Sequence, residues 1–150
     1  MPDLDSFDVK ILRLLRSNGR MTTLEIAERV GLSPTPCSRR IKRLEETGVI
    51  VGYKAVVSPA SLGLTISVVI TVRLAKQGPE ANKQFLEGIS QCPEITECLL
   101  LTGSIDYMLR VWVADIAALR VFITSKLQSI PAVGETSTMV ILDVANGIGV

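Results

Sequence analysis

The stretch TTLEIAERVGLSPTPCSRRIKRLEETG, residues 22–48, contains the start signals of two consecutive helices. Thr22 and Glu25 form a capping-box pattern at the first start. Only the turn GLS separates that helix from the second start, at Ser33 and Pro34. Proline suits the first turn of a helix because its missing N–H would have no partner there. The stretch therefore predicts two helices joined by a tight turn.

The second of these helices has one apolar side and a dense group of cations. Cys37, Ile41 and Leu44 recur at i, i+4 and i+7, which places them on one side of a helix that turns by about 100° per residue. The cations lie elsewhere on its surface, Arg39, Lys42 and Arg43 opposite the apolar side and Arg40 at its flank. We expect the apolar side to pack, with Cys37 in the core rather than acting as a redox thiol, and the positive charge to face outward.

A further helix is expected before this pair. Asp5 is a suitable N-cap, with Asp8 three residues on, and Gly19 follows the last apolar residues. Three short helices of this kind predict a helix-turn-helix, whose third helix enters the major groove of double-stranded DNA. Tyr53 and Lys54 are candidate wing contacts. The alternative for the basic run alone, a merely solvated helix face, stays open.

The charge distribution favours a polyanionic partner for the front of the chain only. Residues 1–54 carry ten Lys or Arg against seven Asp or Glu, whereas residues 55–150 carry six against eight. Histidine is absent and the three cysteines form no C-x-x-C pair, so we expect no catalytic site, metal or cofactor. Free thiols, the absence of a long apolar run and an N-terminus without a signal core favour a cytoplasmic protein without a membrane span.

From residue 65 onward the hydrophobic pattern changes to one typical of an α+β domain. Residues 49–58 predict a short hairpin or a hinge strand, and residues 59–64 a linker. The elements expected after it are a strand over 65–75, a helix over 78–92, strands over 95–101 and 107–114, a helix over 115–130 and a strand over 136–145. This βαββαβ order is that of the ferredoxin-like unit. We therefore predict a DNA-binding domain over 1–62 and a ferredoxin-like domain over 63–150.

Such a sheet leaves one face without helices, and both faces here are rich in apolar residues. Ile66, Val68, Ile70 and Val72 alternate along one side of the first strand, while Val69, Leu100 and Trp112 are candidates for the other. An uncovered apolar face must be buried against something. A second copy related by a two-fold axis is the simplest partner, and it would present two recognition helices to a palindromic site.

Three segments make the sequence resemble the Lrp/AsnC family of transcription regulators: LDSFDVKILRLL, GRMTTLEIAERVGLSPTPCSRRIKRLEETGVIVGY and LTGSIDYMLRVWV. The resemblance covers nearly the whole chain, from Leu4 to about Asp143. It implies a winged helix-turn-helix, a hinge strand and a ferredoxin-like (RAM) domain for effector binding and oligomerisation. It also implies dimers that assemble further, often as a tetramer of dimers, and an amino acid or related metabolite as effector.

The resemblance also indicates which residues contact each ligand. Together with the helical spacing, it places in the DNA-binding segment Ser33, Thr35, Pro36, Ser38, Arg39, Arg40, Lys42 and Arg43. It places in the effector segment Thr102, Gly103, Ser104, Ile105, Asp106 and Tyr107, with Thr136 and Thr138 facing the same pocket. Ser38 and Ile105 depart from the residue types usual in the family.

The chemistry of the effector loop is also open to a simpler interpretation. Asp106 can accept the ammonium group of an amino acid, and the backbone N–H groups near Gly103 can meet its carboxylate. The same Gly and Asp are equally typical of an ordinary turn between strands.

The sequence as a whole predicts a sequence-specific, DNA-binding transcription regulator, at least dimeric, that a small metabolite modulates. Three rivals differ in class: an enzyme, a low-specificity architectural protein that compacts DNA, and a metabolite-sensing module whose helix-turn-helix contacts proteins. The enzyme is disfavoured because no nucleophile has an evident base.

Overall fold

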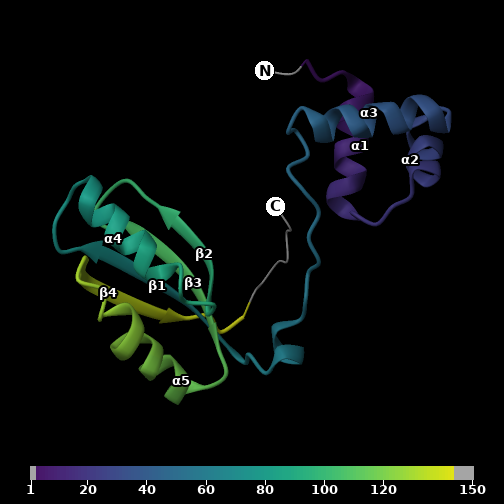
Figure 1. The fold of residues 1–150 in the computed structure, drawn as a ribbon. Helices are drawn as coiled ribbons and strands as arrows, with labels where there is room; N and C mark the ends of the chain where they lie inside the picture. The colour runs from purple at the N-terminus through teal and green to yellow at the C-terminus, as the bar shows by residue number, and fades with distance from the viewer. Residues whose placement is uncertain (1–2, 144–150) are drawn as a thin grey trace. The chain divides into compact units, whose positions relative to one another are not determined.

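The fold is described for residues 3–143 by a computed structural model (Figure 1). The chain divides into two units, one that ends at Val56 and one that begins at Val57. Each unit has a hydrophobic core of its own. Within the described residues, no helix has both the length and the apolar composition that a membrane crossing requires.

The first unit contains the three expected helices, α1 (Ser6–Ser17), α2 (Thr23–Val30) and α3 (Pro34–Glu46). The predicted capping boxes are confirmed at the starts of α1 and α2, where Asp5 and Thr22 bind backbone N–H groups. Local side-chain chemistry therefore determines where two of these helices begin.

The core of this unit forms where the apolar sides of the three helices meet. Its fully buried side chains include Ile11 from α1, Ile26 from α2, and Cys37 and Leu44 from α3. The predicted burial of Cys37 is confirmed, and desolvation raises the pKa of its thiol. This packing directs the opposite side of α3 towards solvent.

The segment after α3 differs from the prediction. Residues 49–58 form neither a hairpin nor a strand within the described chain, and a short 3-10 helix, Pro59–Leu62, follows. The side chains of Val51 and Val56 are each 96% exposed. The β-rich composition is present, but a strand needs a paired neighbour, and the described chain supplies none here.

The second unit has the predicted βαββαβ order. Its elements are β1 (Ile66–Leu74), α4 (Pro79–Ile89), β2 (Ile95–Leu100), β3 (Tyr107–Val113), α5 (Ile116–Val121) with a π-helical continuation (Phe122–Leu127), and β4 (Val133–Val140). The strands form one antiparallel sheet in the order β2-β3-β1-β4. The last strand begins three residues earlier than predicted and ends at Val140, and residues 144–145 of that prediction lie outside the described residues.

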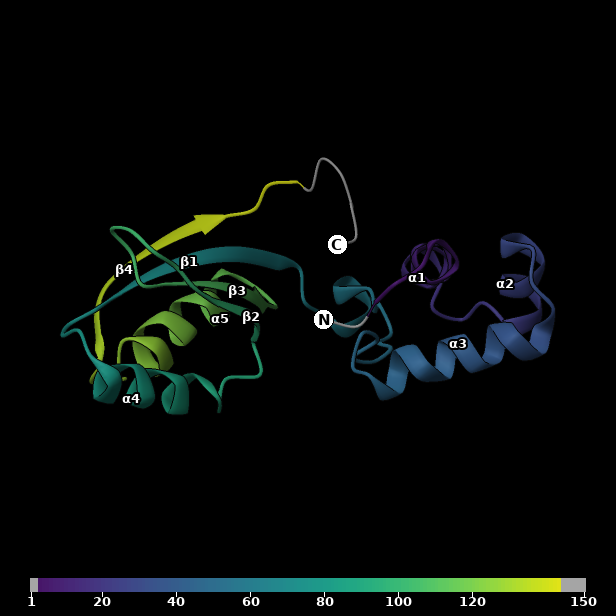
Figure 2. The ribbon, with the colours of Figure 1, turned by 90° about the horizontal axis from the view of Figure 1, so that it is seen from above.

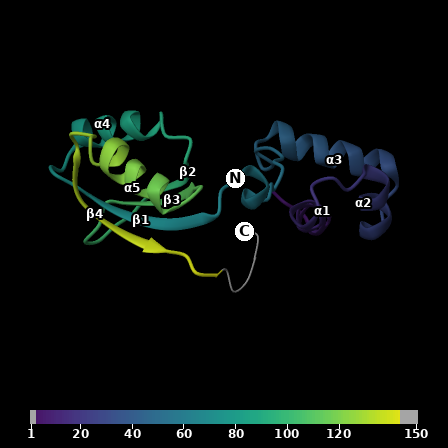
Figure 3. The same ribbon diagram turned by 90° about the horizontal axis from the view of Figure 1, so that it is seen from below.

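Helices α4 and α5 cover one face of this sheet and leave the other open (Figures 2 and 3). The covered face contributes Val68, Ile70 and Val72 to the core, as predicted for one side of β1. The pairing register corrects the prediction for Leu100. It lies opposite Tyr107, a core residue of the covered face, whereas Leu99 lies opposite Met108 on the open face. The alternation of β2 is therefore one residue out of step with the prediction.

Candidate functional site

The amino-terminal turn of α3 is exposed, and its hydroxyl groups have no partner among the described residues. Ser33 is the N-cap residue, but its side chain makes no capping hydrogen bond. Thr35, Pro36 and Ser38 are exposed beside it. No hydrogen bond within residues 3–143 uses the hydroxyl of Ser33, Thr35 or Ser38. A helix start with free N–H and hydroxyl donors is suited to a phosphate group.

Two cations of α3 also face solvent. Arg39 is exposed and makes no ion pair or hydrogen bond among the described residues. Lys42 lies 3.7 Å from Glu46 one turn later, with 76% of its own side chain exposed. Such an exposed pair adds little stability, about 0.3–0.5 kcal/mol, so Lys42 can exchange Glu46 for another anion. Both cations are accessible to a polyanion.

Arg40 and Arg43 are held by the first turn of α1 instead. Arg40 Nη1 donates to Asp5 Oδ2 at 2.6 Å and to Asp8 Oδ1 at 2.9 Å. Arg43 Nη2 donates to Asp8 Oδ2 at 2.5 Å. Asp8 is completely buried, whereas 27% of the Arg40 side chain and 50% of the Arg43 side chain are exposed. The two arginines predicted to contact DNA thus have partners within the protein, which the sequence analysis missed.

Two groups of this cluster, Asp5 and Arg40, have shifted pKa values. The backbone N–H of Asp8, and after it the guanidinium of Arg40, hold the pKa of Asp5 below its ordinary value. Hydrogen bonds to the carboxylates of Asp5 and Asp8 raise the pKa of Arg40 further. In the sequence, Asp5 and Asp8 are recognisable only as a capping pattern for α1. That pattern does not indicate that they bind arginines more than thirty residues away.

The candidate wing residues lie just after α3. The hydroxyl of Tyr53 donates to Glu45 Oε1 at 2.8 Å, and 53% of Tyr53 is exposed. Lys54 is exposed beside it. The hydrogen bond ties the backbone after α3 to the last turn of that helix, so both residues belong to the surface of the first unit.

In the second unit, the predicted effector segment lies between β2 and β3, and two of its residues support the fold. Asp106 Oδ2 accepts the backbone N–H of Leu74 at 2.7 Å, and Gln77 Nε2 donates to Asp106 Oδ1 at 3.0 Å. Tyr107 is 2% exposed and packs its ring against Phe85. Gly103 has φ +123°, a conformation that favours glycine. Gly103 and Asp106 thus have the geometry of a connection between two strands, and Tyr107 begins β3.

A small depression beside this turn brings together other members of the predicted effector set. It has a volume of about 160 Å³ and is lined by Thr71, Arg73, Ser104, Ile105, Glu135, Thr136 and Ser137. Ser104, Ile105 and Thr136 were predicted, whereas Thr102, Gly103, Asp106, Tyr107 and Thr138 do not line it. Arg73 and Glu135, which the sequence analysis missed, form an exposed ion pair at 3.9 Å. Their adjacency follows from the pairing of β1 with β4, which no local pattern reveals.

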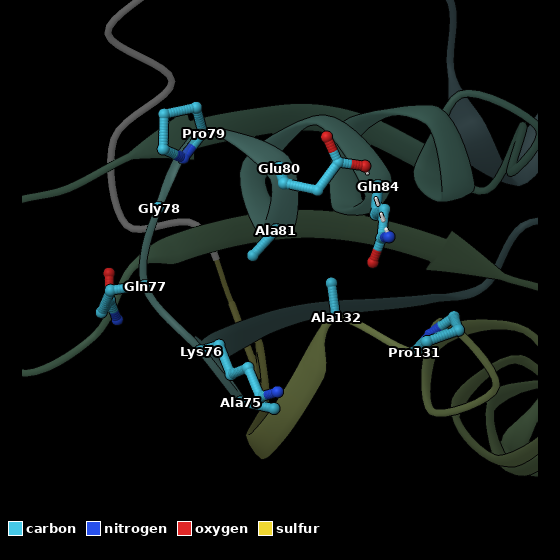
Figure 4. Close-up of a pocket in the computed structure, with 10 residues that line it drawn as sticks. All are labelled: Ala75, Lys76, Gln77, Gly78, Pro79, Glu80, Ala81, Gln84, Pro131 and Ala132. Atoms are coloured by element: carbon cyan, nitrogen blue, oxygen red, sulfur yellow. Dashed lines mark hydrogen bonds between the residues drawn. The ribbon is translucent and has the colours of Figure 1, made fainter.

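A larger pocket of about 500 Å³ lies where β1 leads into α4 (Figure 4). Lys76 and Glu80 provide charges of both signs, and Pro131 and Ala132 also line it. None of the predicted effector residues lines this pocket. Gln77 joins it to the effector turn through its hydrogen bonds with Asp106. No group of three or more acidic, Cys or His side chains suited to a metal occurs within residues 3–143.

Sequence comparisons identify both units. A model described as "Winged helix-turn-helix DNA-binding" matches residues 4–51, and one described as "Lrp/AsnC ligand binding domain" matches residues 67–146. A leucine-responsive regulatory protein from Haemophilus influenzae is 39% identical over 93% of this chain and 84% of that protein. A proline dehydrogenase transcriptional activator from Rhizobium radiobacter is 38% identical over 99% of this chain and 95% of that protein.

Solved structures agree with this assignment. A transcriptional regulator from Neisseria meningitidis in complex with L-Met superposes with a TM-score of 0.91 at 36% identity, covering 96% of this chain and 93% of that one. An AsnC family transcriptional regulator from Agrobacterium tumefaciens superposes with a TM-score of 0.88 at 35% identity, covering 95% of this chain and 93% of that one. These relatives are transcription regulators rather than enzymes. The chain therefore belongs to the Lrp/AsnC family of transcriptional regulators, with a helix-turn-helix DNA-binding domain followed by a ligand-binding domain.

Proposed function

We propose that α3, over residues 33–43, binds double-stranded DNA in a sequence-specific manner. The observation that carries this proposal is the exposed group of donors on α3, contributed by Ser33, Thr35, Ser38, Arg39 and Lys42. Apart from Lys42, which pairs with Glu46, their side chains have no partner among the described residues. Short hydroxyl side chains approach the phosphate backbone closely, and Arg offers a planar fork to guanine or phosphate. Pro36, Arg40 and Arg43 also belong to the proposed contact segment. The two arginines form ion pairs with acids at the start of α1 as well. Binding to chromosomal DNA also implies a cytoplasmic protein.

For the ligand-binding domain, we propose an amino acid as effector, bound at the depression beside the 102–107 turn. Arg73 and Glu135 line it and carry the two charges that an α-amino acid needs opposite its carboxylate and ammonium groups. The solved relative from Neisseria meningitidis contains L-Met, which supports an effector of this class. The domain boundary between residues 62 and 63 stays a prediction.

We further propose that the open face of the sheet forms a dimer, and that dimers assemble further as the family resemblance implies. Apolar side chains occur across this face: Val69, Leu99, Met108, Trp112 and Met139. Apolar side chains gathered on one open face are typical of a surface that a partner covers. Within residues 3–143, the backbone of residues 51–57 has no backbone hydrogen bond, so it is also available to a second copy.

Selection of binding sites from random duplexes, with and without a mixture of L-amino acids, tests the proposed function. We expect one recovered sequence family, with affinity or recovery that changes when the amino acids are present. Unrelated DNA that competes as well as the recovered site would favour the architectural rival. If no amino acid changes the recovered sequences or their affinity, the proposal of an amino-acid effector is contradicted.

Replacing Arg39 with Ala tests the assignment of α3. If Arg39 contacts a phosphate, the variant loses affinity evenly for all duplexes, and the slope of log K against log salt falls by about 1. If it reads a base, the loss is about 1–3 kcal/mol and specificity relaxes. The measurement is a binding titration across a salt series, with Arg120→Ala on α5 as a charge-matched control. Parent-like binding by the Arg39 variant would contradict the proposed interface.

A further inference from the structure

We propose that Asp8 is a positioning residue for DNA recognition, which holds the guanidinium of Arg43 so that its remaining N–H groups meet the duplex in one orientation. This inference rests on the proposed function of α3. It adds a residue that does not itself touch DNA, because Asp8 lies completely buried on α1.

The first argument is the position of the Asp8 carboxylate. Both of its oxygens are used, Oδ1 by Arg40 Nη1 at 2.9 Å and Oδ2 by Arg43 Nη2 at 2.5 Å, and Oδ2 also accepts the backbone N–H of Asp5 at 3.1 Å. A carboxylate removed from water is stable only with partners of this kind. The two arginines therefore have a fixed anchor that cannot swing into solvent.

The second argument is the difference between the two arginines. Arg40 has two acid partners, Asp5 and Asp8, both at its Nη1, its guanidinium lies 5.5 Å from the centre of the Phe7 ring, and only 27% of its side chain is exposed. Arg43 has only Asp8 as a partner among the described residues, and half of its side chain is exposed. A guanidinium has five N–H donors, so most of those on Arg43 remain available. The guanidinium of Arg43 is thus fixed through Nη2, while its other N–H groups can bind another partner.

The third argument concerns the negative charge of Asp8, whose effect on DNA affinity differs from the effect of positioning Arg43. Asp5 and Asp8 together cancel the charges of Arg40 and Arg43, so an acid at position 8 weakens the general attraction of α3 for DNA. Neutralising Asp8 without any positioning effect would strengthen binding to every duplex. Loss of positioning would instead weaken binding to the preferred duplex. Without Asp8, the Arg43 side chain is mobile, and ordering it on binding costs conformational entropy.

Asp8→Asn is therefore compared with Asp3→Asn, which makes the same charge change at an exposed residue without a described partner. Affinities are measured for the duplex recovered by selection and for a scrambled duplex of equal length. We expect Asp3→Asn to leave the ratio of the two affinities unchanged. We expect Asp8→Asn to change the affinity for the scrambled duplex as Asp3→Asn does, and to lower the ratio about tenfold because it weakens binding to the preferred duplex. A ratio equal to that of Asp3→Asn would overturn the inference.

Circular dichroism establishes whether Asp8→Asn is folded. If it is not, Arg43→Lys provides the test, because it retains the charge and removes the fork. The expected result is the same fall in the ratio with an unchanged salt slope, and an unchanged ratio would overturn the inference. A parent protein without preference for any duplex contradicts the proposed function and this inference together. A parent with a preference that both variants keep contradicts this inference alone.

Discussion

Asp106 illustrates how the surroundings of a residue decide its role. Its type and its place in the turn fit either a ligand for an ammonium group or a structural acceptor. In the fold, its carboxylate accepts the backbone N–H of Leu74 and the amide of Gln77. Leu74 is only 6% exposed, so its N–H has little access to water as a replacement. The contribution of Asp106 to stability is therefore separable from effector binding.

Replacing Asp106 with Ala leaves the Leu74 N–H without its acceptor. We expect the free energy of unfolding to fall by about 1–3 kcal/mol, the usual cost of an unsatisfied buried donor. The measurement is urea unfolding without any amino acid present. Ser104→Ala, in the same turn but exposed, is the control and should remain within about 0.5 kcal/mol of the parent. Parent-like unfolding of the Asp106 variant would contradict the structural role.

At the scale of an element, α1 depends on the charge at its first turn. Asp5 caps the backbone N–H groups of Phe7 and Asp8, and its carboxylate also binds Arg40 on α3. One residue thus begins a helix and joins it to its neighbour. The N–H of Asp8 and then the guanidinium of Arg40 lower the pKa of Asp5.

The lowered pKa predicts a pH dependence with a definite sign. A carboxyl group whose pKa is lower in the folded state stabilises the fold above its unfolded value, here 3.8, and loses that effect as pH falls through the folded value. We expect the thermal midpoint of the first unit to decrease as pH is lowered below about 4, and Asp5→Asn to flatten that decrease. Circular dichroism melts between pH 6 and pH 2 provide the measurement. Asp3→Asn should keep the slope of the parent.

At the scale of the whole molecule, the second unit is a two-layer domain with one layer of helices. Its open sheet face carries apolar side chains, whereas a soluble monomer rarely exposes a large continuous apolar patch. Pairing of two such faces joins two DNA-binding units in one molecule, which is the arrangement that a two-fold symmetric site requires.

Neighbouring leucines on β2 allow a matched test of this surface. Leu99 lies on the open face and Leu100 on the opposite one, with 39% and 68% exposed. We expect Leu99→Glu to weaken the dimer at least about tenfold, because a charge would be buried in an apolar interface. Leu100→Glu should leave the assembly as in the parent. Light scattering over a concentration series measures both, and equal masses for the two variants would contradict the proposed face.

The sequence predicted most of the fold because its signals are local. The caps at Asp5 and Thr22 lie within one turn of the helices they begin, and the buried side of α3 follows from the spacing of Cys37, Ile41 and Leu44. The alternation along β1 predicted its buried face in the same way. It did not predict the face of Leu100, because β2 is short and its register depends on its pairing with β3.

By itself, the sequence determined the order of the elements and which side of α3 packs, since each depends on residues a few positions apart. Only the tertiary structure decided which cations of α3 bind acids of α1. Arg39 and Lys42 face solvent, whereas Arg40 and Arg43 bind acids at 32 to 35 positions' distance along the chain. It also brought Arg73 beside Glu135 through strand pairing. Such contacts are set by how elements dock, and a periodic pattern along one element contains no information about its neighbour.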